Sequence, residues 1–183
     1  MSNATPPPAN PDPAPHPSAA TANPPAAQIR LQRVLVPVDF SAPAAKALEY
    51  ARAFAAQFQA RLLLLHVVEL SYVGTGLGEM EAPLLEAELR QNAAQQLERL
   101  LAGLGTDGAA LRTELRLGRP WQEICAAAKE QQVDLIVLGT HGYTGLKHVV
   151  LGSTAERVVR YAPCPVLVVR EREHEFVRPE AAG

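Results

Sequence analysis

The sequence predicts an α/β fold, a doubly wound five-stranded parallel sheet with helices on both faces. The first observation is a regular alternation of short apolar runs with stretches whose apolar residues recur every three or four positions, which is typical of β-α-β units. The second is that hydrophobic residues make up 48% of the chain and charged residues 20%, the composition of an ordinary globular domain. Because aromatic residues are only 5%, we expect a core of alanine, leucine and valine.

The first two strands are predicted to be buried, and a well-marked helix separates them. Residues 34–38 form the first apolar run, and Ser41 is placed to cap the next helix, with Pro43 in its first turn. Apolar residues then repeat at helical spacing as far as Phe58, which gives this helix one buried face. Residues 62–68 are almost wholly apolar, as expected for a parallel strand buried on both faces.

The remaining elements continue this alternation. A glycine-containing loop over residues 71–83 precedes a helix over about residues 84–102. This helix is expected to end at the glycines that follow it. Residues 111–117 alternate apolar and polar side chains, which indicates a less buried edge strand. The later elements are expected to be a helix from Pro120 to about residue 131, a strand at 135–138, a helix from near 153 to 162, and a strand at 166–169.

Two residues mark the end of the sheet where a ligand is expected. In a doubly wound sheet, ligands bind beyond the carboxyl ends of the strands, where the winding reverses. Asp39 follows the first strand and Gly139 follows the fourth, so we expect both to lie next to the ligand. Pro37 has no N–H for a central ladder, and we therefore place it at the end of the first strand, where the chain leaves the sheet.

The stretch from Gly139 to Ser153 is the most informative part of the chain. Gly139 and Gly142 are followed, after nine residues, by Gly152 and Ser153, with an apolar run before the stretch and a helical pattern after it. Glycines let the main chain approach an anion closely, and the first N–H groups of a helix attract negative charge. The spacing matches neither the phosphate loop that ends in GKS or GKT nor the GxGxxG fingerprint. It predicts a phosphate-binding loop and a nucleotide as the ligand.

Several side chains near this loop have two interpretations. Ser153 begins the tetrapeptide STAE, a capping box, so its hydroxyl either caps the helix or binds phosphate; the main-chain N–H groups that follow bind phosphate in both cases. Asp39 either accepts ribose hydroxyls or helps to hold a divalent cation, or it only closes a turn. Lys147 and His148 either screen phosphate charge or lie on a solvated face of the loop.

Charge and residue counts argue against several other function classes. The formal net charge is −2 and there is no basic stripe, so we expect no nucleic-acid partner. No apolar stretch reaches the length of about 18–20 residues that a membrane span requires. Cys125 and Cys164 have no CxxC spacing, and the five histidines show no ligand pattern, so we expect no metal site. Without a secretory signal pattern, we expect a cytoplasmic protein with reduced thiols.

The two ends of the chain differ from its middle. Residues 1–28 contain nine of the 16 prolines, mixed with alanine and small polar residues, and are expected to be a disordered tail. The alternative is a proline-rich docking segment for an unidentified protein partner. Residues 172–183 are expected to form a charged C-terminal tail, which leaves residues 29–171 as a single globular domain.

Taken together, these residues resemble the universal stress protein family. The matching stretches are VLVPVDFS at residues 34–41, LHV at 65–67, GRP at 118–120, the whole of 134–153, and PCPVLVV at 163–169. The resemblance covers about residues 30–170 and leaves only the tails outside. It implies a parallel sheet in the strand order 3-2-1-4-5. It also implies a homodimer joined along the fifth strands, here Val166, Leu167, Val168 and Val169.

The resemblance also implies a ligand, because the family has an ATP-binding branch that carries the glycine motif present here. The implied cofactor is ATP, with the presence of Mg²⁺ left open. Carried over by position, the residues around adenine and ribose are Pro37, Val38, Asp39 and Val67. The residues of the loop are Gly139, Thr140, His141, Gly142, Tyr143, Thr144 and Gly145. The residues at the phosphates are Gly152, Ser153, Thr154 and Ala155.

The expected function is an ATP-binding stress-response module that acts as a homodimer with little or no turnover. Hydrolysis needs a positioned water, a base and strong charge neutralisation. We recognise no Walker B carboxylate, arginine finger or base beside the loop, and assign no catalytic residue. The alternatives are a slow ATPase or a related nucleotide-processing enzyme, and a ligand-free structural dimer.

Overall fold

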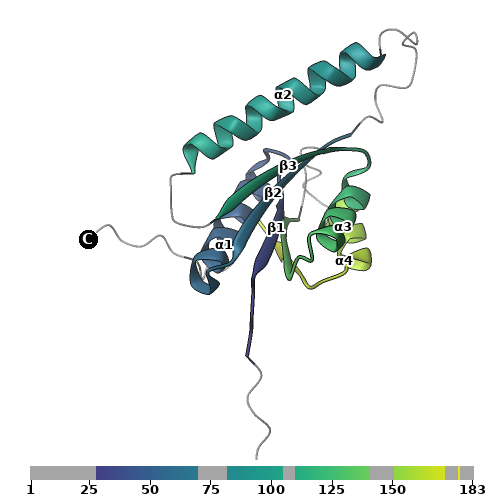
Figure 1. Ribbon diagram of the computed structural model, residues 1–183. Helices are drawn as coiled ribbons and strands as arrows, with labels where there is room; N and C mark the ends of the chain where they lie inside the picture. The colour runs from purple at the N-terminus through teal and green to yellow at the C-terminus, as the bar shows by residue number, and fades with distance from the viewer. Residues whose placement is uncertain (1–27, 70–81, 105–109, 141–150, 172–176, 178–183) are drawn as a thin grey trace, which may run out of the picture.

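The core of the protein is one parallel sheet of five strands in the order β3-β2-β1-β4-β5 (Figure 1), which confirms the predicted order. The computed structural model describes residues 28–69, 82–104, 110–140, 151–171 and 177. The strands are β1 Arg33–Pro37, β2 Arg61–Val68, β3 Leu111–Leu117, β4 Leu135–Gly139 and β5 Val166–Val169. The helices are α1 Ala42–Phe58, α2 Ala82–Gly103, α3 Pro120–Glu130 and α4 Ser153–Tyr161.

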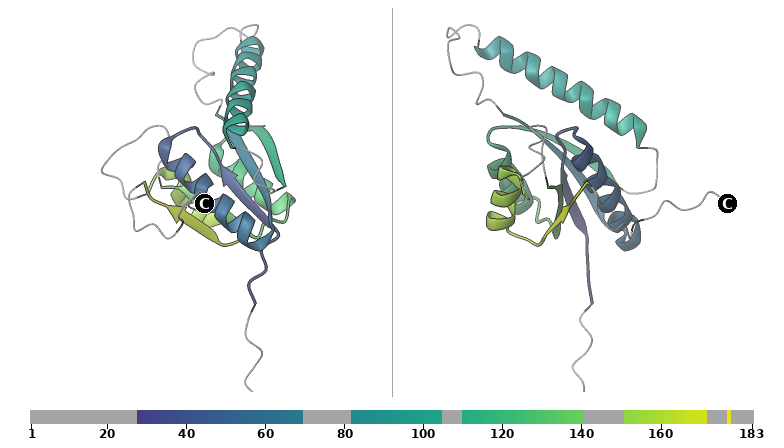
Figure 2. Two further views of the ribbon diagram at one scale, coloured as in Figure 1. Left: turned by 90° about the vertical axis from the view of Figure 1, so that its left-hand side faces the viewer. Right: turned by 180° about the vertical axis from the view of Figure 1, so that it is seen from behind.

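The helices cover both faces of the sheet, as predicted, and Figure 2 shows the helices on the two faces from the side and from behind. Because side chains alternate along a strand, each face has its own core. On one face, Val34, Val36, Leu62 and Leu64 pack with buried residues of α1 and the last turns of α2. On the other face, Leu35, Leu63, Leu65 and Ile136 pack with buried residues of α3 and α4.

The predicted start of α1 is confirmed. Ser41 is the N-cap residue, and its hydroxyl accepts a hydrogen bond from the Ala44 N–H at 3.3 Å. Pro43 lies in the first turn, where a missing N–H costs nothing. Gln59 ends the helix in the left-handed conformation, with φ of 54°. Since α1 returns from the end of one parallel strand to the start of the next, its N-terminus lies at the carboxyl edge of the sheet.

Asp134 fixes the opposite, amino edge of the sheet. Its Oδ2 accepts hydrogen bonds from the main-chain N–H groups of Gln32, at 2.7 Å, and Arg33, at 2.9 Å. Its own N–H donates to the Arg33 carbonyl at 2.9 Å. A carboxylate at the start of β4 thereby holds the start of β1 in register, which supports the central pairing of the sheet.

Several expectations fall on segments beyond the described residues. These segments include nearly all of the proline-rich N-terminal tail, most of the glycine-containing loop before α2, and residues 141–150. Within the described part of the chain, no helix is both long enough and apolar enough to span a bilayer.

Candidate functional site

The two central strands stop pairing before they reach the carboxyl edge of the sheet. The pairing of β1 with β4 ends at Leu35 and Ile136, whereas β1 stays paired with β2 as far as Pro37. The N–H of Val38 donates to the Leu65 carbonyl of β2 at 2.8 Å, so the position of the missing Pro37 N–H, one residue earlier, faces β4. The predicted place of Pro37 at the strand end is confirmed. The strands therefore separate where doubly wound sheets bind ligands.

Gly139 ends β4 and lies directly against the first turn of α1. A Cβ atom on Gly139 would be 2.8 Å from the carbonyl carbon and 2.9 Å from the carbonyl oxygen of Pro43. These are main-chain atoms, which cannot move aside as the end of a flexible side chain can. A glycine is therefore required here for packing alone, and the contact holds the N-terminus of α1 beside the end of β4.

Thr140 ties the start of α4 to the same place. It is 4% exposed, and its N–H donates to the Val169 carbonyl at 3.0 Å. Its carbonyl accepts a hydrogen bond from the Gly152 N–H at 2.7 Å. The N-termini of α1 and α4 thus both lie at the end of β4, and helix N-termini are favourable positions for anions.

The interpretation of Ser153 as a helix cap is wrong. Gly152 is the N-cap residue, in an extended conformation with φ of −68° and ψ of 153°, and no side chain caps α4. The Gly152 carbonyl accepts the first helical bond, from the Glu156 N–H at 2.9 Å. The extended conformation of Gly152 places it outside the helix, so Ser153 is the first helical residue and its hydroxyl is not in the cap position. Ser153 is exposed, Thr154 is half-buried and Ala155 is buried.

Asp39 closes a turn at the end of β1. Its Oδ1 accepts hydrogen bonds from the Ser41 N–H at 3.0 Å and from the Ser41 hydroxyl at 2.5 Å. Phe40, between them, has a φ of 63°, a conformation that the side-chain bonds of Asp39 help to hold. Asp39 thus closes a turn, while its role toward a ligand stays a prediction, and its half-buried carboxylate follows the strand end where β1 no longer pairs with β4.

His66 has a structural role at the same edge. Its Nδ1 lies 2.7 Å from the Val38 carbonyl oxygen, and its ring centroid is 4.7 Å from that of Phe40. Val38 is buried, while Val67 is half-buried. The sequence did not predict the left-handed conformation of Phe40, because a positive φ is uncommon for this residue type. The signal available for it was the Asp-x-Ser turn sequence that surrounds Phe40.

The middle of the predicted loop lies outside the described residues. This applies to His141, Gly142, Tyr143, Thr144 and Gly145, and to Lys147 and His148. The described residues contain no group of three or more His, Cys, Asp or Glu that would hold a metal ion. Burial raises the pKa of Cys125 and of Cys164, and the charge of Asp134 raises the pKa of Cys164 further, so the thiolate form of both is disfavoured.

Comparison with known proteins gives consistent similarities. The model of the Universal stress protein family matches residues 30–170. Universal stress protein MJ0531 of Methanocaldococcus jannaschii is 34% identical over 145 residues, which cover 79% of this chain and 85% of that protein. The structure of MJ0577 from the same organism is 31% identical with a TM-score of 0.72, and the match covers 80% of this chain and all of that one. Universal stress protein UspA from Lactobacillus plantarum is 35% identical with a TM-score of 0.65, over 78% of this chain and all of its own.

Proposed function

This chain belongs to the universal stress protein family, and from that premise we propose that it binds ATP at the carboxyl edge of its sheet as a homodimeric stress-response module with little or no turnover. The observation that carries the proposal is the gap between β1 and β4. The pairing of these strands ends at Leu35 and Ile136, and two helix N-termini are fixed beside the gap, by the contact of Gly139 with Pro43 and the hydrogen bond between Gly152 and Thr140.

The phosphates of ATP would meet the first turn of α4. The N–H groups of Ser153, Thr154 and Ala155 belong to the first turn, which has no intrahelical acceptors for its N–H groups. The helix dipole adds partial positive charge at this end. Ala155 is buried and has no polar side-chain atom, so it can bind phosphate only through its main-chain N–H. Main-chain groups are therefore expected to contribute most to phosphate binding, together with Gly142 and the rest of the loop.

The adenosine part would lie at the ends of β1 and β2. Pro37 and Val67, which are half-buried, offer apolar surface for the base, whereas the side chain of Val38 beside them is buried in the core on the α1 face. The ribose hydroxyls would donate to the Asp39 carboxylate, which Ser41 already orients. Mg²⁺, if it enters with ATP, would be held mainly by phosphate oxygens and water, as this ion usually is.

Low turnover is supported by the side chains around the gap that the structure describes. Asp39 is already committed to the Ser41 turn, and His66 to the Val38 carbonyl, so neither is placed as a base for an attacking water. We therefore propose that bound ATP acts through its occupancy, by changing the dimer or a partner surface. Steady-state phosphate release tests this point; a rate of about 1 per second that is lost in Asp39→Ala would instead establish an ATPase.

The ATP site is tested by titration calorimetry with two substitutions of Ser153. Ser153→Ala removes only the hydroxyl, whereas Ser153→Pro removes the hydroxyl and the main-chain N–H. Proline fits this first helical position, because the preceding Gly152 is already extended, with ψ of 153°. We expect Ser153→Pro to weaken ATP binding by about tenfold or more, the value of a hydrogen bond to a charged group, and Ser153→Ala to weaken it less.

Two results would contradict this site. One is an absence of heat at millimolar ATP with the unsubstituted protein, and the other is unchanged affinity in Ser153→Pro. Circular dichroism and the thermal midpoint of each variant show whether α4 is intact.

The dimer is proposed to form along β5, which is an edge strand. The carbonyls of Pro165 and Val169 accept bonds from β4, at 3.1 and 3.0 Å, so by alternation the main-chain groups of Val166 and Val168 face the open edge. The Val168 side chain packs on its own core. A charge at this position would therefore disturb the monomer as well as the dimer.

A substitution that removes a main-chain N–H separates the effect on the dimer from the effect on the monomer core. Val168→Pro removes an outward N–H, and Val168→Thr is the control that keeps both the shape and the N–H. Sedimentation is expected to give monomers for Val168→Pro and dimers for Val168→Thr. A dimer that persists in Val168→Pro would rule out pairing through this edge.

A further inference from the structure

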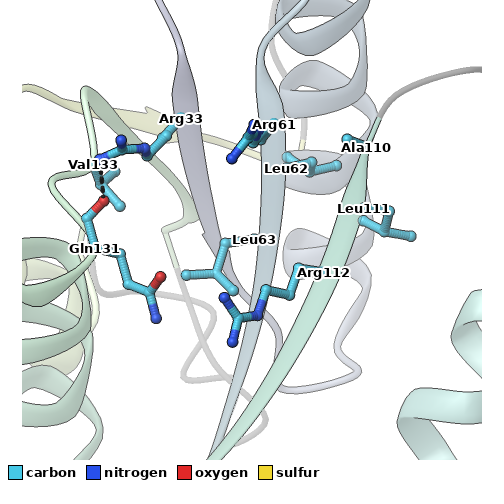
Figure 3. Close-up of a pocket in the computed structure, with 9 residues that line it drawn as sticks. All are labelled: Arg33, Arg61, Leu62, Leu63, Ala110, Leu111, Arg112, Gln131 and Val133. Carbon is cyan, nitrogen blue, oxygen red and sulfur yellow. Dashed lines mark hydrogen bonds between the residues drawn. The ribbon is translucent and has the colours of Figure 1, made fainter.

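A hollow of about 180 Å³ lies at the amino edge of the sheet, at the opposite end from the proposed ATP site. It is formed by the first residues of β1, β2 and β3 and by the turn after α3 (Figure 3). Binding sites for drug-sized molecules usually have volumes of about 300–1,000 Å³. This hollow is therefore suited to a ligand much smaller than a nucleotide.

Strand register brings three arginines to one face of the sheet here. Arg33 of β1 pairs with Arg61 of β2, and Leu63, two residues further along β2, pairs with Arg112 of β3. Because residues two apart on a strand share a face, Arg33, Arg61 and Arg112 all lie on the face covered by α3. Figure 3 shows Arg112 extending toward Leu63, with Arg61 in the same hollow.

The three guanidinium groups differ in whether they have hydrogen-bond partners within the described part of the protein. Arg33 is used within the fold, since its Nη1 donates to the Gln131 carbonyl at 2.8 Å. Arg61 and Arg112 are exposed, and neither side chain makes a hydrogen bond or ion pair within the described ranges of the chain. No aspartate or glutamate is among the residues that line the hollow in the described structure. Glu114, two residues beyond Arg112 on the same face, is engaged by Arg116 at 2.6 Å and by Gln131 at 2.9 Å, so two like charges face a space whose own described lining holds no carboxylate.

The floor of the hollow is apolar. Leu63 and Val133 are each only 7% exposed and belong to the core shared with α3 and α4. A guanidinium group binds a carboxylate through two parallel N–H bonds, while an apolar floor favours a hydrocarbon body. We propose that this hollow binds a small organic carboxylate, with its head group between Arg61 and Arg112 and its body on Leu63 and Val133.

The test is a titration of the full chain with benzoate, followed by the amide shifts of Leu63, Arg112 and Val133 in ¹H–¹⁵N spectra. Benzyl alcohol, which lacks the charge, and inorganic phosphate, which lacks the apolar body, serve as comparison ligands. Benzoate is expected to shift these amides in a saturable way, and to bind more tightly than either comparison ligand. Equal binding of benzyl alcohol or of phosphate would overturn the proposal.

Two double variants with the same change in net charge make the test specific. Arg61→Gln with Arg112→Gln is expected to weaken benzoate binding by about tenfold or more. The matched control is Arg90→Gln with Arg160→Gln, which removes two exposed arginines that pair with glutamates on their own helices, each at 3.1 Å, and is expected to leave binding unchanged. Equal affinity in the two double variants would refute the site. ATP affinity is expected to be the same in both, so a failure here is distinguishable from a failure of the ATP site.

Discussion

The two edges of the sheet are built from different kinds of chemical group. At the carboxyl edge, the two helix N-termini are held by main-chain atoms and small residues: Gly139 against Pro43, and the N–H of Gly152 on the carbonyl of Thr140. At the amino edge it is held by charged side chains. Asp134 binds the start of β1, and Arg33 binds the turn after α3.

This difference determines how each edge can recognise a ligand. Main-chain N–H groups at helix ends suit a polyphosphate, because they present many donors without bulk. Long guanidinium side chains around an apolar floor suit a small anion with a hydrocarbon part. It also follows that a substitution at the carboxyl edge should change stability and nucleotide binding together, whereas one at the amino edge should change stability and leave nucleotide binding intact.

The largest expected effect is that of Gly139→Val. The added side chain would press on the carbonyl group of Pro43 from 2.8–2.9 Å, so β4 and α1 must separate, at a cost of about 3 kcal/mol in the free energy of unfolding. Urea denaturation measures this loss, and calorimetry should show weaker ATP binding in the protein that remains folded.

Gly103→Ala is the control for Gly139→Val. A Cβ atom on Gly103 would meet no atom within 4 Å, and an alanine there is expected to leave stability unchanged or raise it by about 0.5 kcal/mol. If Gly139→Val were as stable as Gly103→Ala, the close packing at the end of β4 would be wrong.

A smaller effect is expected at the amino edge for Asp134→Ala. The substitution removes the acceptor of two main-chain N–H groups, at 2.7 and 2.9 Å, and should lower the free energy of unfolding by about 1.5 kcal/mol, because the site is partly open to water. ATP affinity should stay at the level of the unsubstituted protein. A large loss of ATP binding in Asp134→Ala would show that the two edges are not independent.

The smallest effect is expected on the flank of the sheet, at Glu130. Its carboxylate lies 2.6 Å from Nη2 of Arg116, and its side chain is 61% exposed. This hydrogen bond lowers the pKa of Glu130 below its ordinary value of 4.5. A lowered folded-state pKa stabilises the protein above pH 4.5, and this contribution is lost as the pH falls through the lowered value.

Thermal midpoints measured across pH check this expectation. Glu130→Gln should differ slightly from the unsubstituted protein near pH 7, and the two should converge as the pH falls below 4.5. A difference that grows in acid would mean that Glu130 is stabilised in its protonated form instead.

Much of the carboxyl edge could be predicted from the sequence, because its signals are local. The turn at Asp39, the cap at Ser41 and the strand end at Pro37 each follow from the chemistry of neighbouring residues. The sequence left open whether Ser153 caps α4 or binds phosphate; the cap position belongs to Gly152, whose N–H bonds to the distant Thr140 carbonyl. A tertiary contact of this kind leaves no local pattern.

The amino edge could not be predicted in this way. Arg33, Arg61 and Arg112 are far apart in the chain, and only the register of three strands brings them to one face. Asp134 gave a weak signal, as a carboxylate directly before a buried strand, but its partners lie about a hundred residues earlier. Sites assembled from distant side chains need the fold before they can be recognised.

The contact between Gly139 and Pro43 has a consequence for evolution within this fold. A descendant that had abandoned its ligand would still lose fitness on replacing this glycine, because the protein would fold poorly. We therefore expect selection on folding to retain Gly139 whether or not the ligand is used, so this glycine by itself is not evidence that a ligand is bound.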